Sequence, residues 1–275
     1  MRNLFTRTAS GLVFLGVMVG GLLGGDIPYA CLMVFLLGGM LHEFYKLTLE
    51  RKHGLQKAAG ITFGLVLWST SFQLLQGNSL RLDAGELSMA AGIFVLLLLI
   101  AQLYRKDEKP FQAVAYTLLG ILYIAVPLSL FNILGVDNRP VLLGLFIILW
   151  SSDVGAYVFG MLFGQKGKHK LFPSVSPKKS WEGFIGGLLV ASATGHILWS
   201  VGMLPCGLVH TLIISLLIAV FGVFGDLVES MLKRSVGVKD SGHIMPGHGG
   251  LLDRFDAALF ALPVALFYIK IFSLS

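Results

Sequence analysis

Acidic and basic side chains suited to a metal–phosphate complex gather between residues 226 and 256, in a chain that is otherwise mostly apolar. On a helix, Asp226, Glu229 and Lys233 would share one face, because their spacing follows the helical repeat. Asp253 and Asp256 would share a face of the following helix for the same reason. Mg²⁺ takes one or two carboxylates and fills its remaining positions with water and substrate phosphates. These two acidic faces therefore predict a divalent cation that holds a phosphorylated substrate.

The segment SPKKSWEG, at residues 176–183, is a second candidate for anion binding. A helix beginning at Pro177, or capped by Ser180, would offer free backbone N–H groups at its start. Together with Lys178 and Lys179, such a helix start would bind phosphate groups. The alternative is that these lysines only mark the cytoplasmic side of the membrane.

Asp153 lies inside an apolar segment, next to two serines. A carboxylate within a membrane helix costs roughly 2.5–3.5 kcal/mol on insertion scales, so it is expected to face a partner or a wet cavity. The alternative is that Asp153 lies near the cytoplasmic end of its helix and meets water.

The elements that must position these residues are membrane helices. Of the 275 residues, 55% are hydrophobic and only 13% are charged, whereas soluble domains contain about 25% charged residues. A bilayer-spanning helix needs about 20 apolar residues. We therefore expect an all-α, polytopic membrane protein with about nine transmembrane helices. The predicted apolar segments are 11–25, 28–44, 58–76, 88–104, 111–135, 140–164, 183–203, 207–232 and 251–273.

The short first two segments leave open a re-entrant or tilted hairpin around Asp26 and Pro28. We expect one membrane domain, in which residues 1–140 supply N-terminal helices and residues 141–275 the catalytic region. An N-terminal signal peptide is the less favoured alternative, because no clear small-residue cleavage site follows the first apolar run.

The distribution of basic residues predicts the orientation. Eighteen of the 21 lysines and arginines fall in the N-terminus and alternate connections, and the three others are Arg81, Arg139 and Lys270. By the positive-inside rule, the N-terminus and both large polar loops are cytoplasmic, and the C-terminus is outside. Topology also accounts for the net charge of +6, so no nucleic-acid partner is expected.

Several other kinds of site are disfavoured. Cys31 and Cys206 lie in or beside apolar segments and suggest neither a disulfide framework nor a redox pair. A zinc site of His243, His248 and Asp253 is conceivable, but its spacing matches no zinc motif. The sequence contains no GxxxxGK[ST] motif, so a P-loop nucleotide site is excluded.

Residues 230–256 resemble the phosphatidate cytidylyltransferase family, also called CDP-diacylglycerol synthases. The shared signature is S-x-x-K-R, four residues, K-D-x-G, three residues, P-G-H-G-G, two residues and D-R-x-D. It is matched here by Ser230, Lys233, Arg234, Lys239, Asp240, Gly242, Pro246, Gly247, His248, Gly249, Gly250, Asp253, Arg254 and Asp256. The resemblance covers residues 145–270 well.

The resemblance implies a reaction of CTP with phosphatidic acid that gives CDP-diacylglycerol and pyrophosphate. It also implies Mg²⁺ as cofactor, a homodimer, and an inner-membrane location with the active site facing the cytoplasm. The family's metal-binding aspartates match Asp226 and Asp253. We expect both to act in catalysis together with Lys233, Lys239 and Asp240.

The predicted substrate-binding residues are polar side chains or glycines that allow close backbone approach. They are Asp153, Lys178, Lys179, Ser180, Arg234, His248, Gly249, Gly250 and Arg254. The phosphate of the lipid is already an anionic nucleophile, so no strong general base is needed. Asp240 and His248 are therefore expected to orient ligands rather than to exchange protons.

Two other functions compete with this one. A related CTP-dependent lipid enzyme, such as a polyprenol or phytol kinase or a synthase acting on an ether-linked lipid, would use similar chemistry. A transporter would use Asp153, Asp226 and Asp253 as an ion pathway. Transporters usually place such charges near the midplane between repeated halves, whereas here the charges gather at one end and no repeat is found.

Overall fold

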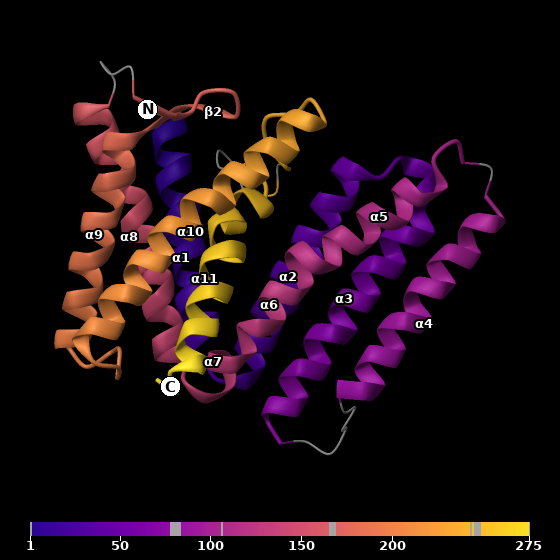
Figure 1. Ribbon diagram of the computed structural model, residues 1–275, viewed down its shortest axis with the longest axis horizontal. Helices are drawn as coiled ribbons and strands as arrows, with labels where there is room; N and C mark the ends of the chain where they lie inside the picture. Colours follow the sequence, from indigo (N-terminus) through magenta and orange to yellow (C-terminus); the bar gives the residue numbers. More distant parts are fainter. Residues whose placement is uncertain are drawn as a thin grey trace. The chain divides into compact units, whose positions relative to one another are not determined.

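The protein is almost entirely helical (Figure 1). The computed structural model describes residues 2–77, 84–105, 107–164, 169–242, 244 and 249–274. Its helices are α1 (Arg2–Leu23), α2 (Asp26–Thr48), the 3₁₀ turn η1 (Arg51–His53), α3 (Gly54–Leu75), α4 (Ala84–Leu103), α5 (Pro110–Gly120), the π-helical turn η2 (Ile121–Ala125), α6 (Val126–Leu130), α7 (Asn132–Asp137), α8 (Arg139–Phe163), α9 (Trp181–Ser200), α10 (Leu208–Ser235) and α11 (Leu252–Ile271). Two short strands, β1 (Lys170–Phe172) and β2 (Ser176–Ser180), precede α9.

Within the described residues, seven helices are long and apolar enough to cross a membrane. They are Asp26–Thr48, Arg51–Leu75, Gly85–Leu103, Pro110–Asp137, Arg139–Phe163, Trp181–Ser200 and Leu208–Ser235. The apolar part of α1, Ser10–Leu23, is shorter, and α11 carries three charged residues in its first turns. These helices confirm the predicted all-α, multi-pass architecture. Helices suit this environment, because in lipid a helix satisfies its own backbone hydrogen bonds. The count of nine spans and the side of the N-terminus stay predictions.

The first two apolar segments form two long helices. α1 ends at Leu23 and α2 begins at Asp26, so only two glycines separate them. Gly25 has a φ of 104°, a backbone conformation that favours glycine and permits this abrupt connection.

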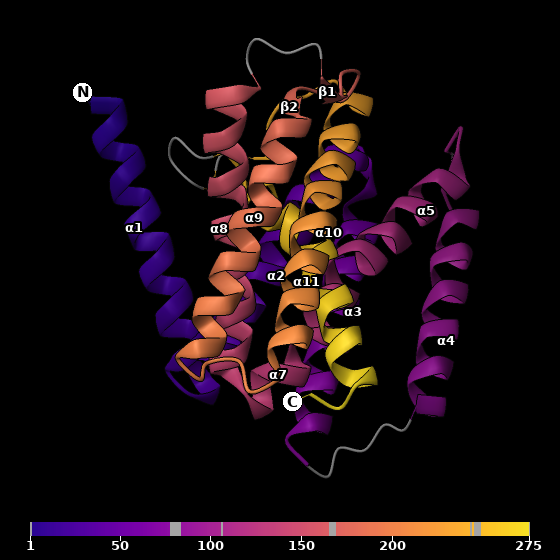
Figure 2. The ribbon, with the colours of Figure 1, turned by 60° about the vertical axis from the view of Figure 1, so that its left-hand side comes forward.

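The chain forms two compact units. One comprises Met33–Asn132, and the other comprises Met1–Leu32 with Ile133–Ser275. The first contains most of α2 together with α3 to α6, and its core includes the buried ring of Tyr45, whose hydroxyl donates to Thr117 O over 2.8 Å. The second contains α8 to α11, which lie side by side (Figures 1 and 2). The expected division at residue 140 stays a prediction.

Small residues let α8 and α9 pack closely. A Cβ atom on Gly155 of α8 would lie 2.7 Å from Val190 Cβ, and one on Gly186 of α9 would lie 2.3 Å from Phe159 Cβ. Membrane helices commonly approach each other through glycine in this way, because no side chain separates their backbones. This packing helps to position β1 and β2, which precede α9, at one end of the unit.

We expect Gly155→Ala to lower the thermal unfolding temperature of the purified protein, because its new methyl group overlaps Val190. Gly160→Ala is the matched control, since its Cβ would meet nothing closer than 3.5 Å. Both substitutions gain similar helix propensity, so their difference, about 1–3 kcal/mol, measures the overlap. Equal unfolding temperatures for the two variants would show that the α8–α9 contact is not tight at Gly155.

The segment between α8 and α9 forms an antiparallel hairpin, which the sequence did not reveal. β1 pairs with β2, with Lys170 opposite Ser180 and Phe172 opposite Ser176. The side chain of Ser180 caps α9 by accepting a hydrogen bond from Gly183 N over 3.2 Å, as one of the two alternatives predicted. The other, a helix beginning at Pro177, is wrong, because that residue lies within β2.

Candidate active site

The candidate site is built where α10 crosses α11. A Cβ atom on Gly225 would lie 2.4 Å from Asp256 O and 2.9 Å from Ala257 Cα, so the two backbones touch at this point. Only glycine fits such an approach. As a result, the polar residues that follow Gly225 on α10 face the first turns of α11.

Lys233 joins the two helices by an ion pair with a carboxylate from each. Its Nζ lies 2.5 Å from Glu229 Oε2 on α10 and 2.7 Å from Asp253 Oδ1 on α11. The side chain of Glu229 is fully buried, and that of Lys233 is 12% exposed. Within the described residues, Glu229 Oε1 has no hydrogen-bond partner, although a buried polar atom is normally satisfied.

Backbone N–H groups also hold Asp253. Ser241 N donates to Asp253 Oδ2 over 2.9 Å, and Gly250 N donates to the same oxygen over 2.7 Å. Gly249 has a φ of 84°, and a Cβ atom there would lie 2.7 Å from Asp253 Oδ2. Glycine at this position therefore serves both the backbone conformation and the close approach to the carboxylate.

Asp226 is paired with a lysine from the hairpin. Lys179 Nζ lies 2.8 Å from Asp226 Oδ2 and donates to Val223 O over 3.3 Å. Ser230 Oγ donates to the other carboxylate oxygen, Asp226 Oδ1, over 3.1 Å. The hairpin and the end of α10 lie at the same end of their unit (Figures 1 and 2), so β2 contributes directly to the site.

Five acidic residues, which we call the carboxylate cluster, gather around this crossing. They are Asp153, Asp226, Glu229, Asp253 and Asp256. Asp153 on α8 interacts electrostatically with Asp226, and Asp256 interacts with both. Glu229 and Asp256 lie on the two acidic faces expected from the helical spacing, although neither was predicted to be a metal ligand.

The carboxylate cluster suits a divalent cation. Among the described residues, the cations that interact with it include Lys179, Lys233 and Arg254. The described residues contain no group of three or more histidine, cysteine, aspartate or glutamate side chains arranged around a metal position. Mg²⁺ does not require one, because one or two carboxylates suffice when phosphates and water complete its shell. The donor set therefore fits Mg²⁺, with Glu229 Oε1, which has no hydrogen-bond partner within the described residues, beside it.

Four of the other predicted site residues lie at the surface. Lys178, Arg234, Lys239 and Asp240 are exposed and, among the residues whose positions are known, form no ion pair. Arg234 Nη1 donates to Val238 O over 3.2 Å, which orders the turn after α10. His248, and His243 of the zinc alternative, lie outside the described residues.

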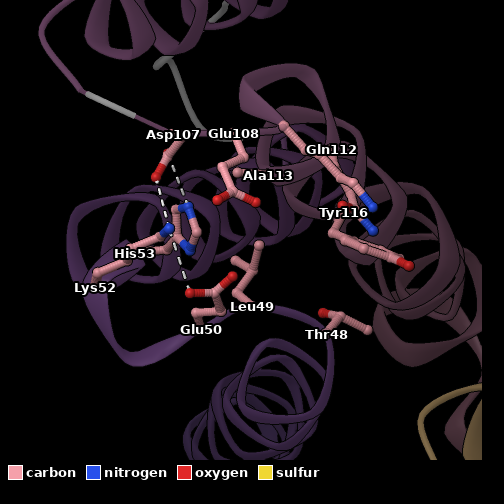
Figure 3. Close-up of a pocket in the computed structure, with 11 residues that line it drawn as sticks. Thr48, Leu49, Glu50, Lys52, His53, Asp107, Glu108, Gln112, Ala113 and Tyr116 are labelled. Atoms are coloured by element: carbon pink, nitrogen blue, oxygen red, sulfur yellow. Dashed lines mark hydrogen bonds and ion pairs between the residues drawn. The ribbon is translucent and has the colours of Figure 1, made fainter.

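The other compact unit, Met33–Asn132, contains a cavity of about 240 Å³ (Figure 3). Figure 3 shows Asp107 pointing toward Lys52 and His53, with Asp107 Oδ1 3.0 Å from Lys52 Nζ and Oδ2 3.0 Å from His53 Nε2. The hydrogen bond from Lys52 lowers the pKa of Asp107 below its usual value. Because these charges pair with one another and join two connections between helices, we assign this cluster a structural role.

Comparisons with known proteins agree with the resemblance in the signature. A model of the cytidylyltransferase family matches residues 5–272. Phosphatidate cytidylyltransferase of Bacillus subtilis is 35% identical over 276 residues, which cover 99% of this chain and 98% of that protein. The corresponding protein of Staphylococcus haemolyticus is 39% identical over 177 residues, covering 64% of this chain and 66% of the relative. That of Staphylococcus aureus is 40% identical over 159 residues, covering 58% and 60%. Matched over nearly its whole length, the chain belongs to the cytidylyltransferase family.

Proposed function

We propose that this protein converts CTP and phosphatidic acid to CDP-diacylglycerol and pyrophosphate, as the names of its relatives indicate. The observation that carries this proposal is the pairing of Asp226 with Lys179 and of Asp253 with Lys233 at one end of the membrane helices. Carboxylates and ammonium groups side by side match the mixed charges of a metal–triphosphate complex.

The reaction needs positioning and charge neutralisation more than covalent help from the protein. A phosphate oxygen of phosphatidic acid forms a bond to the α-phosphorus of CTP. The bond from that phosphorus to the bridging oxygen breaks, and its electron pair leaves with pyrophosphate. Lys179, Lys233 and Arg254 would neutralise the phosphate charge, and Gly249 and Gly250 would let the backbone approach the ligand.

Mg²⁺ would be held by Asp226 and Asp253, and when bound it would supply positive charge against the CTP phosphates. Asp253 is suited to this role, because the backbone N–H groups of Ser241 and Gly250 hold its carboxylate in place. Asp240 stays a predicted orienting residue, and the exposed Lys239 a predicted phosphate ligand.

We also propose that the site faces the cytoplasm, that the protein lies in the inner membrane and that it acts as a homodimer. The first proposal is supported by the excess of lysine and arginine in the N-terminus and alternate connections, which would all be cytoplasmic. The bacterial relatives agree with a location in the plasma membrane. The homodimer rests on the family resemblance alone.

The test is to incubate purified protein in liposomes with phosphatidic acid, Mg²⁺ and CTP labelled in the cytosine base. We expect the label to enter the lipid fraction with an equal amount of pyrophosphate released. A parallel reaction with CTP labelled at the γ-phosphate distinguishes the alternatives. Transfer of γ-label to lipid would identify a kinase, whereas uptake of solute without chemistry would identify a transporter.

A further inference from the structure

We propose that Lys179 is an exchangeable counter-ion of Asp226. It holds the carboxylate before nucleotide arrives and moves to the phosphates when CTP and the metal bind. This inference rests on the proposed function and adds to it an order of events at the metal site. Lys179 would thereby couple the binding of the metal to that of the nucleotide.

Lys178 and Lys179 are adjacent in β2, but their side chains lie in different environments. Successive side chains of a strand point to opposite faces, and in β2 the side chain of Lys178 is exposed while that of Lys179 is half-buried. Lys179 therefore turns toward Asp226 and Val223 on α10, whereas Lys178 turns to solvent. The two lysines, equivalent in sequence, occupy different electrostatic environments.

Lys179 is also better placed to move than the second lysine of the site. Lys233 is 12% exposed and bonded to two carboxylates from different helices. Lys179 is 23% exposed, and Asp226 is its one carboxylate partner among the described residues, with 41% of that side chain exposed. Its backbone belongs to a short two-stranded hairpin. Release of Lys179 therefore breaks one ion pair and leaves the α10–α11 contact intact.

The exchange follows from competition for one carboxylate. With Lys179 Nζ 2.8 Å from Asp226 Oδ2, an ammonium group lies beside the oxygen that Mg²⁺ would need. A metal entering alone must break this pair, and the ammonium group then keeps only its weaker electrostatic interaction with Asp153. CTP removes that cost, because its phosphates give the ammonium group a new partner. Metal and nucleotide should therefore favour each other's binding.

The experiment measures the metal and the nucleotide separately, without phosphatidic acid, so that no turnover occurs. Mn²⁺ replaces Mg²⁺ and its free concentration is followed by electron paramagnetic resonance, using full-length protein stripped of metal. Binding of CTP is measured by equilibrium dialysis at saturating Mg²⁺. Lys179→Met removes the ammonium group and keeps an unbranched side chain, while Lys178→Met removes the same charge from the adjacent residue. Lys179→Arg keeps the charge, and Asp226→Asn tests whether the bound Mn²⁺ is at Asp226.

In the absence of nucleotide, we expect Lys179→Met to bind Mn²⁺ about fivefold more tightly than wild type, because the competing partly exposed ion pair is gone. The same variant should bind CTP about tenfold more weakly, since a charge-assisted phosphate contact is lost. Lys178→Met and Lys179→Arg should keep the wild-type Mn²⁺ affinity, and Asp226→Asn should lose it.

The proposal is overturned if Lys179→Met binds Mn²⁺ no more tightly than Lys178→Met, or if Asp226→Asn binds Mn²⁺ as wild type does. Failure of every variant to bind Mn²⁺ without nucleotide would overturn it as well. Transfer of base label to lipid by the wild-type protein tests the proposed function independently. An active enzyme whose Mn²⁺ affinity does not respond to Lys179→Met would refute the exchange alone.

Discussion

Asp253→Asn is expected to lower the rate of cytidylyl transfer by about a thousandfold, which corresponds to roughly 4 kcal/mol of lost transition-state stabilisation. The substitution keeps the shape of the side chain and removes its negative charge. Its carbonyl oxygen can still accept from Ser241 N and Gly250 N, but the amide NH₂ then faces the ammonium group of Lys233. We therefore expect the substitution to weaken metal binding and charge neutralisation at the site, and to leave the fold intact. Incorporation of base-labelled CTP into lipid measures it.

Two controls separate this effect from a general change in charge or stability. Asp137→Asn removes the same charge from an exposed residue at the end of α7 and should leave the rate unchanged. The unfolding temperature of Asp253→Asn should fall only moderately, because Lys233 keeps its ion pair with Glu229. Near-normal transfer by Asp253→Asn would contradict the assignment of this carboxylate to the metal.

Helical periodicity was sufficient to anticipate the α10 side of the site. Glu229 and Lys233, four residues apart, meet through an ion pair because a helix brings such positions onto one face. The long apolar segments likewise predicted the helices, since a backbone in lipid must satisfy its own hydrogen bonds. Both properties depend on residues that are close together in the sequence and lie in the same helix. They can therefore be predicted from the sequence alone.

The β1–β2 hairpin, in contrast, could not be predicted from sequence patterns. Residues 170–180 contain lysines, serines and prolines without the alternating apolar pattern that reveals a strand. The sequence therefore grouped Lys178 with Lys179, and only the pairing of β1 with β2 shows that they turn to different sides. The ion pair between Lys179 and Asp226 depends on tertiary contacts between elements far apart in the sequence.

The sequence did not predict the crossing of α10 and α11 either. One glycine among 34, Gly225, allows the backbones to touch, and nothing in the sequence distinguishes it from the glycines that pack α8 against α9. This contact brings Asp256 near Asp226 and Asp153 and so enlarges the acidic site beyond the two predicted metal ligands. The composition of the carboxylate cluster is therefore a property of the packing.

Lys233→Met is expected to destabilise the protein by about 3–5 kcal/mol and to abolish transfer, because it leaves buried carboxylates without their cation. Glu229 is fully buried and Asp253 nearly so, and both lose their bond to the same ammonium group. Methionine fills similar space, so the effect reports charge rather than a cavity. Thermal unfolding in detergent and the lipid-labelling assay measure the two losses.

The double variant Glu229→Gln/Lys233→Met tests the cause. Removing the second charge leaves a neutral amide in place of the buried carboxylate, while Asp253 keeps its hydrogen bonds from Ser241 N and Gly250 N. The double variant should therefore be more stable than Lys233→Met, with a coupling energy of about 1–3 kcal/mol between the two sites. Transfer should stay abolished, because Lys233 is also a proposed phosphate ligand. Additive losses would mean that Glu229 and Lys233 do not stabilise each other, whereas recovery of stability without activity separates the structural role of Lys233 from its role in the reaction.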